Sequence, residues 1–103
     1  MKEQVLNFIN RFTFNGEYQE VIDSFSCGCC YWFATILLKR FSFIENACIM
    51  YDPIENHFGC SIDGSVYDIH GDVTNKYEWE NWNFYAAQDE FETSRIYRDC
   101  INF

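Results

Sequence analysis

The sequence lacks the features of membrane-spanning and exported proteins. It has no apolar run of about 18 residues, the length that a membrane-spanning helix needs. Its N-terminus, MKEQVLNFINRF, is charged and amphipathic, so the basic stretch and apolar core of a signal peptide are missing. We therefore expect a cytoplasmic protein without a membrane partner.

Positive charge is also scarce. The chain has 7 Lys and Arg residues against 16 Asp and Glu residues, and its net charge is −9. Because binding to phosphates needs a basic surface, this balance excludes direct nucleic-acid binding. It is compatible with a basic protein partner, with imitation of nucleic acid, or with a role in solubility alone.

The residues that are present predict a folded protein. The length of 103 residues suits one compact domain, and we expect residues 1–103 to form it. Aromatic residues make up 20% of the chain, far more than disordered segments carry. Without an export signal, the 6 cysteines are expected to be reduced. Cys48 and Cys60 lie in apolar strand-like runs, where a thiol packs as a small hydrophobic group.

The spacing of apolar residues predicts an α+β fold. We expect a small antiparallel sheet, packed against a buried central helix, with further helices at both ends of the chain. Residues 18–25 fit a helix or a strand equally well. The expected helices span residues 2–12, 29–41 and 86–100, the last with Phe91, Ile96 and Tyr97 as apolar contacts, and the expected strands span residues 46–52, 57–62 and 65–70.

The two later strands are predicted to form a hairpin over residues 57–70. Asp63-Gly64 is a strong signal for a two-residue turn, since a type I′ turn needs positive φ at both central positions. That turn pairs Ile62 with Ser65, and the pairing then continues to residues 57 and 70. The turn fixes the register, and the register decides which side chains share a face.

The hairpin places polar side chains together on one face. His57 and Asp68 become diagonal neighbours within hydrogen-bond reach, because side chains alternate along each strand. Gly59, opposite Asp68, leaves an unfilled position across which the imidazole can lean. His70 lies opposite His57 and is a second candidate, but it is less well placed relative to Asp68.

A cluster of cysteines precedes the buried helix. Cys27-Gly28-Cys29-Cys30 opens an apolar segment, so Cys30 falls at a helix start. The unpaired N–H groups and positive dipole of a helix N-terminus favour the nucleophilic thiolate. A cysteine nucleophile, a histidine base and an acidic orienting group are the parts of a thiol hydrolase. We expect Cys30, His57 and Asp68 to form such a triad without metal or cofactor, with the Cys30 N–H in the oxyanion hole.

Each of these groups also has a structural explanation. A single thiol at this position is most simply a core residue, and a His–Asp pair on a strand is most simply a surface pair. The conjunction of the three groups favours catalysis.

The cysteine cluster resembles a known signature. Cys27-Gly28-Cys29-Cys30-Tyr31 is similar to the C-G-[SA]-C-[WY] motif of papain-like cysteine proteases, with Cys30 at the nucleophile. Cys29 departs from the motif, which has Ser or Ala there. The order Cys30, His57, Asp68 looks more like the compact transglutaminase-like and NlpC/P60-type branches of that superfamily, and like short proteins of phages and mobile elements.

The resemblance covers residues 27–72. It implies a compact papain-like fold and acyl transfer on a protein or peptide substrate: cleavage of a peptide, isopeptide or amide bond, or transamidation. The side-chain oxyanion donor of the superfamily has no plain counterpart here, and Gln19 and Ser24 are weak candidates for it.

Two other cysteine chemistries remain open. Cys27 and Cys30 form a C-x-x-C at a helix start, as in thioredoxin-like redox proteins, although the βαβ framework is missing and the only proline is Pro53. Zinc binding by the cysteine cluster with Cys48 or Cys60 is disfavoured, because adjacent cysteines rarely fit one tetrahedral site.

A non-catalytic function is the remaining alternative. A small acidic protein resembling mobile-element proteins is compatible with an inhibitor that binds a host protein, such as an anti-CRISPR-like protein or a DNA mimic. Its acidic surface would come from a C-terminal group of carboxylates: Glu78, Glu80, Asp89, Glu90 and Glu92.

Overall fold

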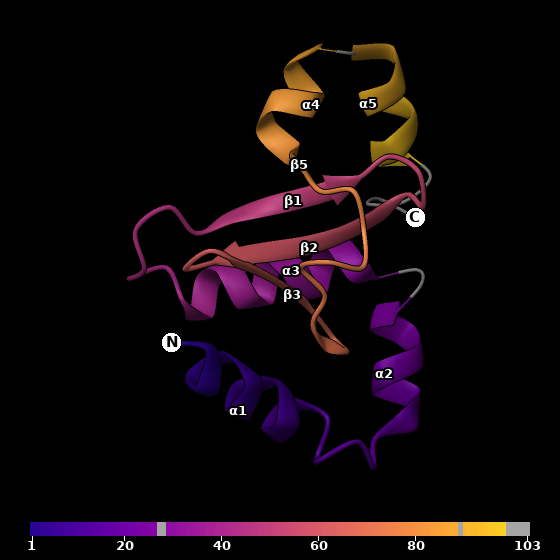
Figure 1. Ribbon diagram of the computed structural model, residues 1–103. Coiled ribbons are helices and arrows are strands. Elements are labelled where there is room, and N and C mark those ends of the chain that lie inside the picture. The colour runs from indigo at the N-terminus through magenta and orange to yellow at the C-terminus, as the bar shows by residue number, and fades with distance from the viewer. Residues whose placement is uncertain (27–28, 89, 99–103) are drawn as a thin grey trace.

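The computed structural model describes residues 1–26, 29–88 and 90–98 and has the expected α+β fold (Figure 1). The described strands form one antiparallel sheet in the order β4-β3-β2-β1-β5. The helices are α1 (Lys2–Phe12), α2 (Gln19–Ser26), α3 (Cys30–Arg40), α4 (Trp82–Gln88) and α5 (Glu90–Ile96). The strands are β1 (Cys48–Asp52), β2 (His57–Ile62), β3 (Ser65–Asp68), β4 (Gly71–Asp72) and β5 (Glu80–Asn81).

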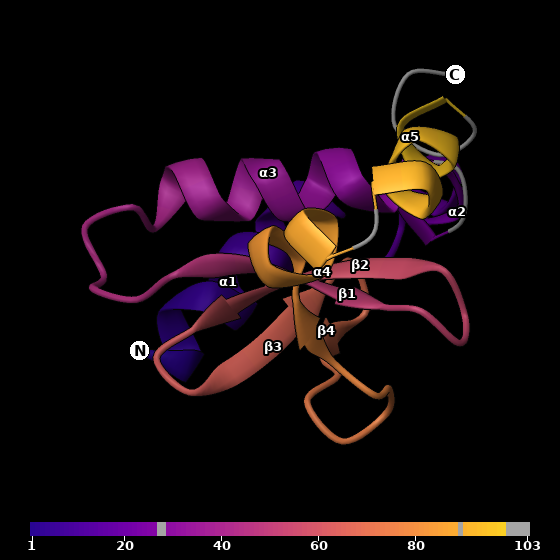
Figure 2. The ribbon, with the colours of Figure 1, turned by 90° about the horizontal axis from the view of Figure 1, so that it is seen from above.

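The sheet has a different cover on each face. Helix α3 lies against one face, and the connection from β4 to β5 crosses the other (Figures 1 and 2). Helix α1 lies near the β4 edge, whereas α4 follows β5 at the opposite edge. Strand β2 therefore lies between β1 and β3 within the sheet, and between α3 and this connection across it.

The core lies between α3 and the sheet. Phe58, Cys60 and Ile62 alternate along β2 and are fully buried, as the hairpin pattern predicts. Phe33 and Leu37 of α3, also buried, belong to the same core cluster. The core thus forms where the apolar face of the hairpin meets the central helix.

The helices at the N-terminal end follow the predicted pattern closely. The helix expected at residues 2–12 is α1, and it buries Val5 and Ile9 from one stripe. The helix expected at residues 29–41 is α3. Of residues 18–25, which fitted either type, those from Gln19 onward are helical in α2, and Tyr18 precedes the helix.

None of the helices in the described segments is by itself both long and apolar enough to cross a membrane. Only α2 and α3 taken together satisfy that test by length and composition, and they are bent by 103° relative to each other.

The C-terminal end differs from the expectation. The single helix expected at residues 86–100 is two short helices, α4 and α5, and Asp89 and residues 99–103 lie outside the described residues. Ile96 is buried as expected, and Tyr97 contacts the ring of Trp82. The expected core role of Phe91 is wrong, because its side chain is 84% exposed.

The hairpin has the predicted turn and register. Asp63 and Gly64 have φ values of 52° and 87°, and the pairs are Ile62–Ser65, Ser61–Val66 and Cys60–Tyr67. The expectation that the second strand runs to residue 70 is wrong. It ends at Asp68, and the chain turns at residues 69–70 so that Asp68 pairs with Gly71 of β4.

The early turn has a local cause. The Asp68 carboxylate accepts a hydrogen bond from the His70 backbone N–H at 2.7 Å, which offers the backbone an alternative to the strand ladder. Gly71 then adopts a φ of 106°, which a glycine tolerates without strain.

Candidate active site

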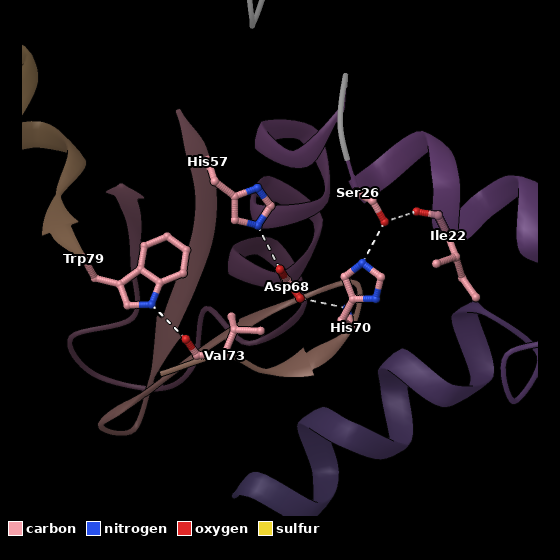
Figure 3. A network of polar contacts seen from close by, with 7 residues as sticks. All are labelled: Ile22, Ser26, His57, Asp68, His70, Val73 and Trp79. Atoms are coloured by element: carbon pink, nitrogen blue, oxygen red, sulfur yellow. Dashed lines mark hydrogen bonds and ion pairs between the residues drawn. The ribbon is translucent and has the colours of Figure 1, made fainter. Parts of the chain in front are cut away.

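His57 and Asp68 meet across the two central strands. His57 is the first residue of β2 and Asp68 the last of β3, and their side chains point toward each other (Figure 3). The imidazole Nε2 lies 2.8 Å from Asp68 Oδ2, and the two side chains are only 8% and 3% exposed. The contact that the hairpin register predicts is therefore present, and it is buried.

The Asp68 carboxylate is fixed through both of its oxygens. Oδ2 accepts the hydrogen bond of His57, and Oδ1 accepts that of the His70 backbone N–H. The turn that ends β3 thus also orients the carboxylate toward the imidazole. Since Asp68 is a fixed acceptor, it selects the tautomer of His57 that carries a proton on Nε2.

Cys30 is the third residue of the predicted triad. It is the first residue of α3, it is buried, and its side chain is hydrogen-bonded to His57. Because Nε2 of the ring is engaged by Asp68, Nδ1 is the nitrogen left to face the sulfur. A thiol, an imidazole and a carboxylate are therefore in hydrogen-bonded sequence, the order that nucleophilic catalysis by cysteine requires.

The charge state of His57 reflects these neighbours. Burial of the ring has the largest single influence on the pKa of His57 and lowers it. The hydrogen bonds to Asp68 and Cys30, together with their negative charges, outweigh burial and raise the pKa of His57 from 6.5 to about 9. At neutral pH this favours the protonated imidazole of His57.

Two aromatic side chains of the connection between β4 and β5 cover the imidazole. The Tyr77 ring stacks on His57 with centroids 4.7 Å apart, and the Trp79 ring is 5.9 Å away. Trp79 is anchored by a hydrogen bond of 3.0 Å from its Nε1 to the Val73 carbonyl (Figure 3). These rings limit the access of water to the His57–Asp68 hydrogen bond.

Gly59 makes room for this cover. A Cβ at this position would lie 3.0 Å from the Trp79 ring and 2.9 Å from Val66 Cγ1. The space that we expected the imidazole to use is thus occupied by Trp79. Neither aromatic residue was expected from the sequence, although a glycine inside a strand is itself a signal for a close approach.

His70 does not join the triad as an alternative base. We expected it opposite His57 on one face, but it lies in the turn after β3 and is exposed. Its Nε2 is 2.8 Å from Ser26 Oγ, and Ser26 donates in turn to the Ile22 carbonyl (Figure 3). His70 therefore connects the turn beside Asp68 to the end of α2.

The candidate donors to the oxyanion hole lie in different parts of the structure. Gln19 lies at the start of α2, where its Nε2 donates to Asp23 Oδ1 at 2.8 Å, and this end of α2 is remote from the start of α3 (Figure 1). Ser24 is exposed, and its backbone carbonyl accepts the Cys29 N–H at 3.0 Å. The Cys30 N–H, in the first turn of α3, remains the predicted oxyanion donor.

The other cysteines bear on the alternative chemistries. Cys60 is fully buried, and burial raises its pKa to about 12, as expected of an inert core thiol. Cys48 is half-buried and accepts a hydrogen bond from Asn81.

Within the described segments, no group of three His, Cys, Asp or Glu side chains lies close enough together to hold a metal ion. Cys27, on which the redox hypothesis depends, lies outside the described residues.

Comparison with known proteins gives one match. Residues 8–100 match the family described as Phage YunG-like protein. No curated protein and no solved structure matches the chain. The match associates the chain with phages and gives no support to the expected membership of the papain-like superfamily.

Proposed function

The chain belongs to the phage YunG-like family, and for this protein we propose the function of a cysteine hydrolase or acyltransferase acting on an amide or isopeptide bond. The observation that carries the proposal is the buried hydrogen-bonded series of Cys30, His57 and Asp68. Cys30 is the nucleophile, His57 the general acid and base, and Asp68 the group that orients the imidazole.

The reaction has two halves. In the first, the Cys30 sulfur attacks the substrate carbonyl carbon, and the developing oxyanion accepts a hydrogen bond from the Cys30 N–H. His57 gives its Nδ1 proton to the leaving amine, the carbon–nitrogen bond breaks, and a thioester remains on Cys30. In the second half, His57 removes a proton from water or from an acceptor amine, which attacks the thioester and regenerates the thiolate.

The surroundings of His57 support this role. The ring must stay in one orientation while its charge changes, and the Asp68 hydrogen bond with the Tyr77 stack restricts its rotation. A pKa of about 9 for His57 keeps the proton available for the leaving group at neutral pH. A protein or peptide amide is the substrate class that this chemistry serves.

The first test is selective alkylation of Cys30. The protein is treated with a limiting amount of iodoacetamide at neutral pH, and modified peptides are quantified by mass spectrometry over time. We expect Cys30 to react faster than Cys48 and Cys60. His57→Ala should slow that reaction about tenfold or more, because the proton acceptor and positive charge are lost.

The chain supplies a matched control for this test. His70 is the only other histidine and makes no contact with the triad through its side chain in Figure 3, so His70→Ala should change the Cys30 rate less than about twofold. Uniform slow labelling of the cysteines, or equal effects of the two histidine variants, would rule out an activated Cys30.

The second test asks for acyl transfer itself. p-Nitrophenyl acetate should release a burst of nitrophenolate and leave an acetyl group on Cys30, detected by mass. Cys30→Ser should abolish the burst. Nitrophenolate release that is unchanged in Cys30→Ser would contradict the proposal.

A non-catalytic inhibitor is the second candidate, and exposed groups near the C-terminal end favour it. Phe84 and Phe91 are 71% and 84% exposed on α4 and α5, and Glu78, Glu80 and Glu90 are exposed nearby in the chain. Exposed aromatic rings among carboxylates suit a basic protein partner. A biological effect on the host that survives Cys30→Ser would favour this candidate over the enzyme.

A further inference from the structure

A second concave site lies between α1 and the C-terminal end of α3. Its volume is about 440 Å³, and no triad residue lines it. The lining consists of two arginines, four carboxamides and one buried ring: Arg11, Arg40, Gln4, Asn7, Asn10, Asn15 and Phe41. No Asp or Glu lines the cavity. In a chain with 16 carboxylate side chains, this composition is unusual.

Both arginines lack a carboxylate partner within the described residues. The ion pairs of Lys and Arg found there join Lys2 to Asp72 and Arg95 to Glu92. Lys2 and Arg95 are thus paired with carboxylates, whereas neither of the two arginines that share the cavity is. Their positive charge is available to a ligand.

The Arg40 guanidinium is held in place by aromatic rings. It lies 5.8 Å from the Phe8 ring centroid and 5.2 Å from that of Phe41. Stacking on ring faces fixes the plane of the guanidinium and leaves the N–H groups at its edge free to donate. Arg11 follows Phe8 by three positions on α1, so it projects from the same side of that helix.

Helix ends explain only part of this arrangement. Arg11 and Arg40 each lie in the last turn of a helix, where a cation complements the dipole. Lys39, also in the last turn of α3, supplies a positive charge that complements the same helix dipole, and it does not line the cavity. The dipole therefore accounts for a cation at each helix end, but not for two guanidinium groups and four carboxamides around one cavity.

We infer that this cavity binds a small polar molecule through its oxyanion group, phosphate or carboxylate, held between Arg11 and Arg40. A guanidinium presents paired N–H donors that match either oxyanion. The carboxamides of Gln4, Asn7, Asn10 and Asn15 supply donors and acceptors for the rest of the ligand. The volume falls in the range of small-molecule sites and exceeds the needs of a bare phosphate ion.

Isothermal titration calorimetry at low ionic strength tests the inference with three probes: inorganic phosphate, adenosine 5′-monophosphate and succinate. We expect saturable binding with one ligand per protein. If the site prefers phosphate, adenosine 5′-monophosphate should bind more tightly than inorganic phosphate. If it prefers carboxylate, succinate should bind more tightly than inorganic phosphate. The nucleotide and succinate distinguish a phosphate ligand from a carboxylate ligand. Cys30→Ser should bind equally well, so the result is independent of the proposed catalysis.

Charge-matched variants give the decisive comparison. Arg11→Gln and Arg40→Gln should each weaken binding about tenfold or more, since each removes a charge-assisted contact. Lys39→Gln removes the same charge from the neighbouring position and should weaken binding less than about twofold. Arg40→Lys keeps the charge but loses the planar donors, so its affinity should lie between wild type and Arg40→Gln. Circular dichroism checks that each variant is folded.

Two results would overturn the inference. One is the absence of saturable binding for all three probes up to about 5 mM, where affinities of biological use would be detected. The other is an equal loss of affinity in Lys39→Gln and Arg40→Gln, which would show attraction to the helix end in general.

Discussion

The Nε2 atom of His70 lies 2.8 Å from Oγ of Ser26, which precedes it by 44 positions in the chain. The contact joins the turn that orients Asp68 to the last residue of α2, shortly before the cysteine cluster. The two segments that supply the carboxylate and the nucleophile are thus connected outside the triad.

A double-mutant cycle measures this connection. His70→Ala and Ser26→Ala should each lower the free energy of unfolding by about 1 kcal/mol, because each removes the same hydrogen bond. The double variant should lose little more than either single variant, as urea denaturation would show. Fully additive losses would mean that the contact contributes nothing to stability.

The stability of the protein should depend on pH through His57. The pKa of His57 is about 9 in the folded protein and 6.5 as its ordinary value, so protonation favours the folded state. The contribution is fully present below pH 6.5 and is lost as pH rises through about 9. Its size is at most about 3 kcal/mol.

His57→Gln isolates that contribution. The difference in unfolding free energy between wild type and His57→Gln should shrink from about pH 6 to about pH 10, as urea denaturation at each pH would measure. A difference that stays constant over this range would contradict the raised pKa of His57.

Gly59→Ala should destabilise the protein by about 1–3 kcal/mol. The new methyl group would lie 2.9 Å from Val66 Cγ1, 3.0 Å from the Trp79 ring and 3.1 Å from the Tyr67 carbonyl oxygen. Thermal denaturation measures the loss. Gly64→Ala serves as a contrast, because nothing lies within 4 Å of its added methyl group and only backbone strain at a φ of 87° remains. An unchanged melting temperature in Gly59→Ala would show that Trp79 does not pack on β2 as described.

Asp68→Asn separates the charge of the carboxylate from its position. The amide oxygen still accepts from His57, but the negative charge that raises the pKa of His57 is gone. Alkylation of Cys30 at neutral pH should therefore slow about tenfold, and the free energy of unfolding should fall by at most about 3 kcal/mol. Asp72→Asn, on the neighbouring strand and outside the triad, should leave the alkylation rate nearly unchanged. Equal rates in wild type and Asp68→Asn would remove Asp68 from the mechanism.

The parts of the fold that depend on local signals could be predicted from the sequence. Asp63-Gly64 specifies the turn, the turn specifies the register, and the register places His57 beside Asp68. The apolar stripe of α1 follows from its spacing in the same way. In these cases, the decisive interactions join residues that are close in the chain.

Other features depend on competition or on distant partners. Strand β3 ends early because the Asp68 carboxylate accepts a hydrogen bond from the backbone N–H of His70, two residues later in the chain. Tyr77 and Trp79 cover His57 from a connection without a regular pattern, so no periodicity marks them. Phe91 looks like a core residue in the sequence, yet it is exposed because Trp82 and Ile96 bury the apolar surface of α4 and α5 instead.

The place of His57 on β2 has a consequence for dynamics. This strand is bonded on both sides, to β1 and to β3, so its amide groups should exchange with solvent more slowly than those of the edge strands. The imidazole is therefore carried at one end of the strand that should be the last of the sheet to open. On heating, its orientation should persist until the cooperative melting of the whole sheet, long after the two-residue edge strands have begun to fray.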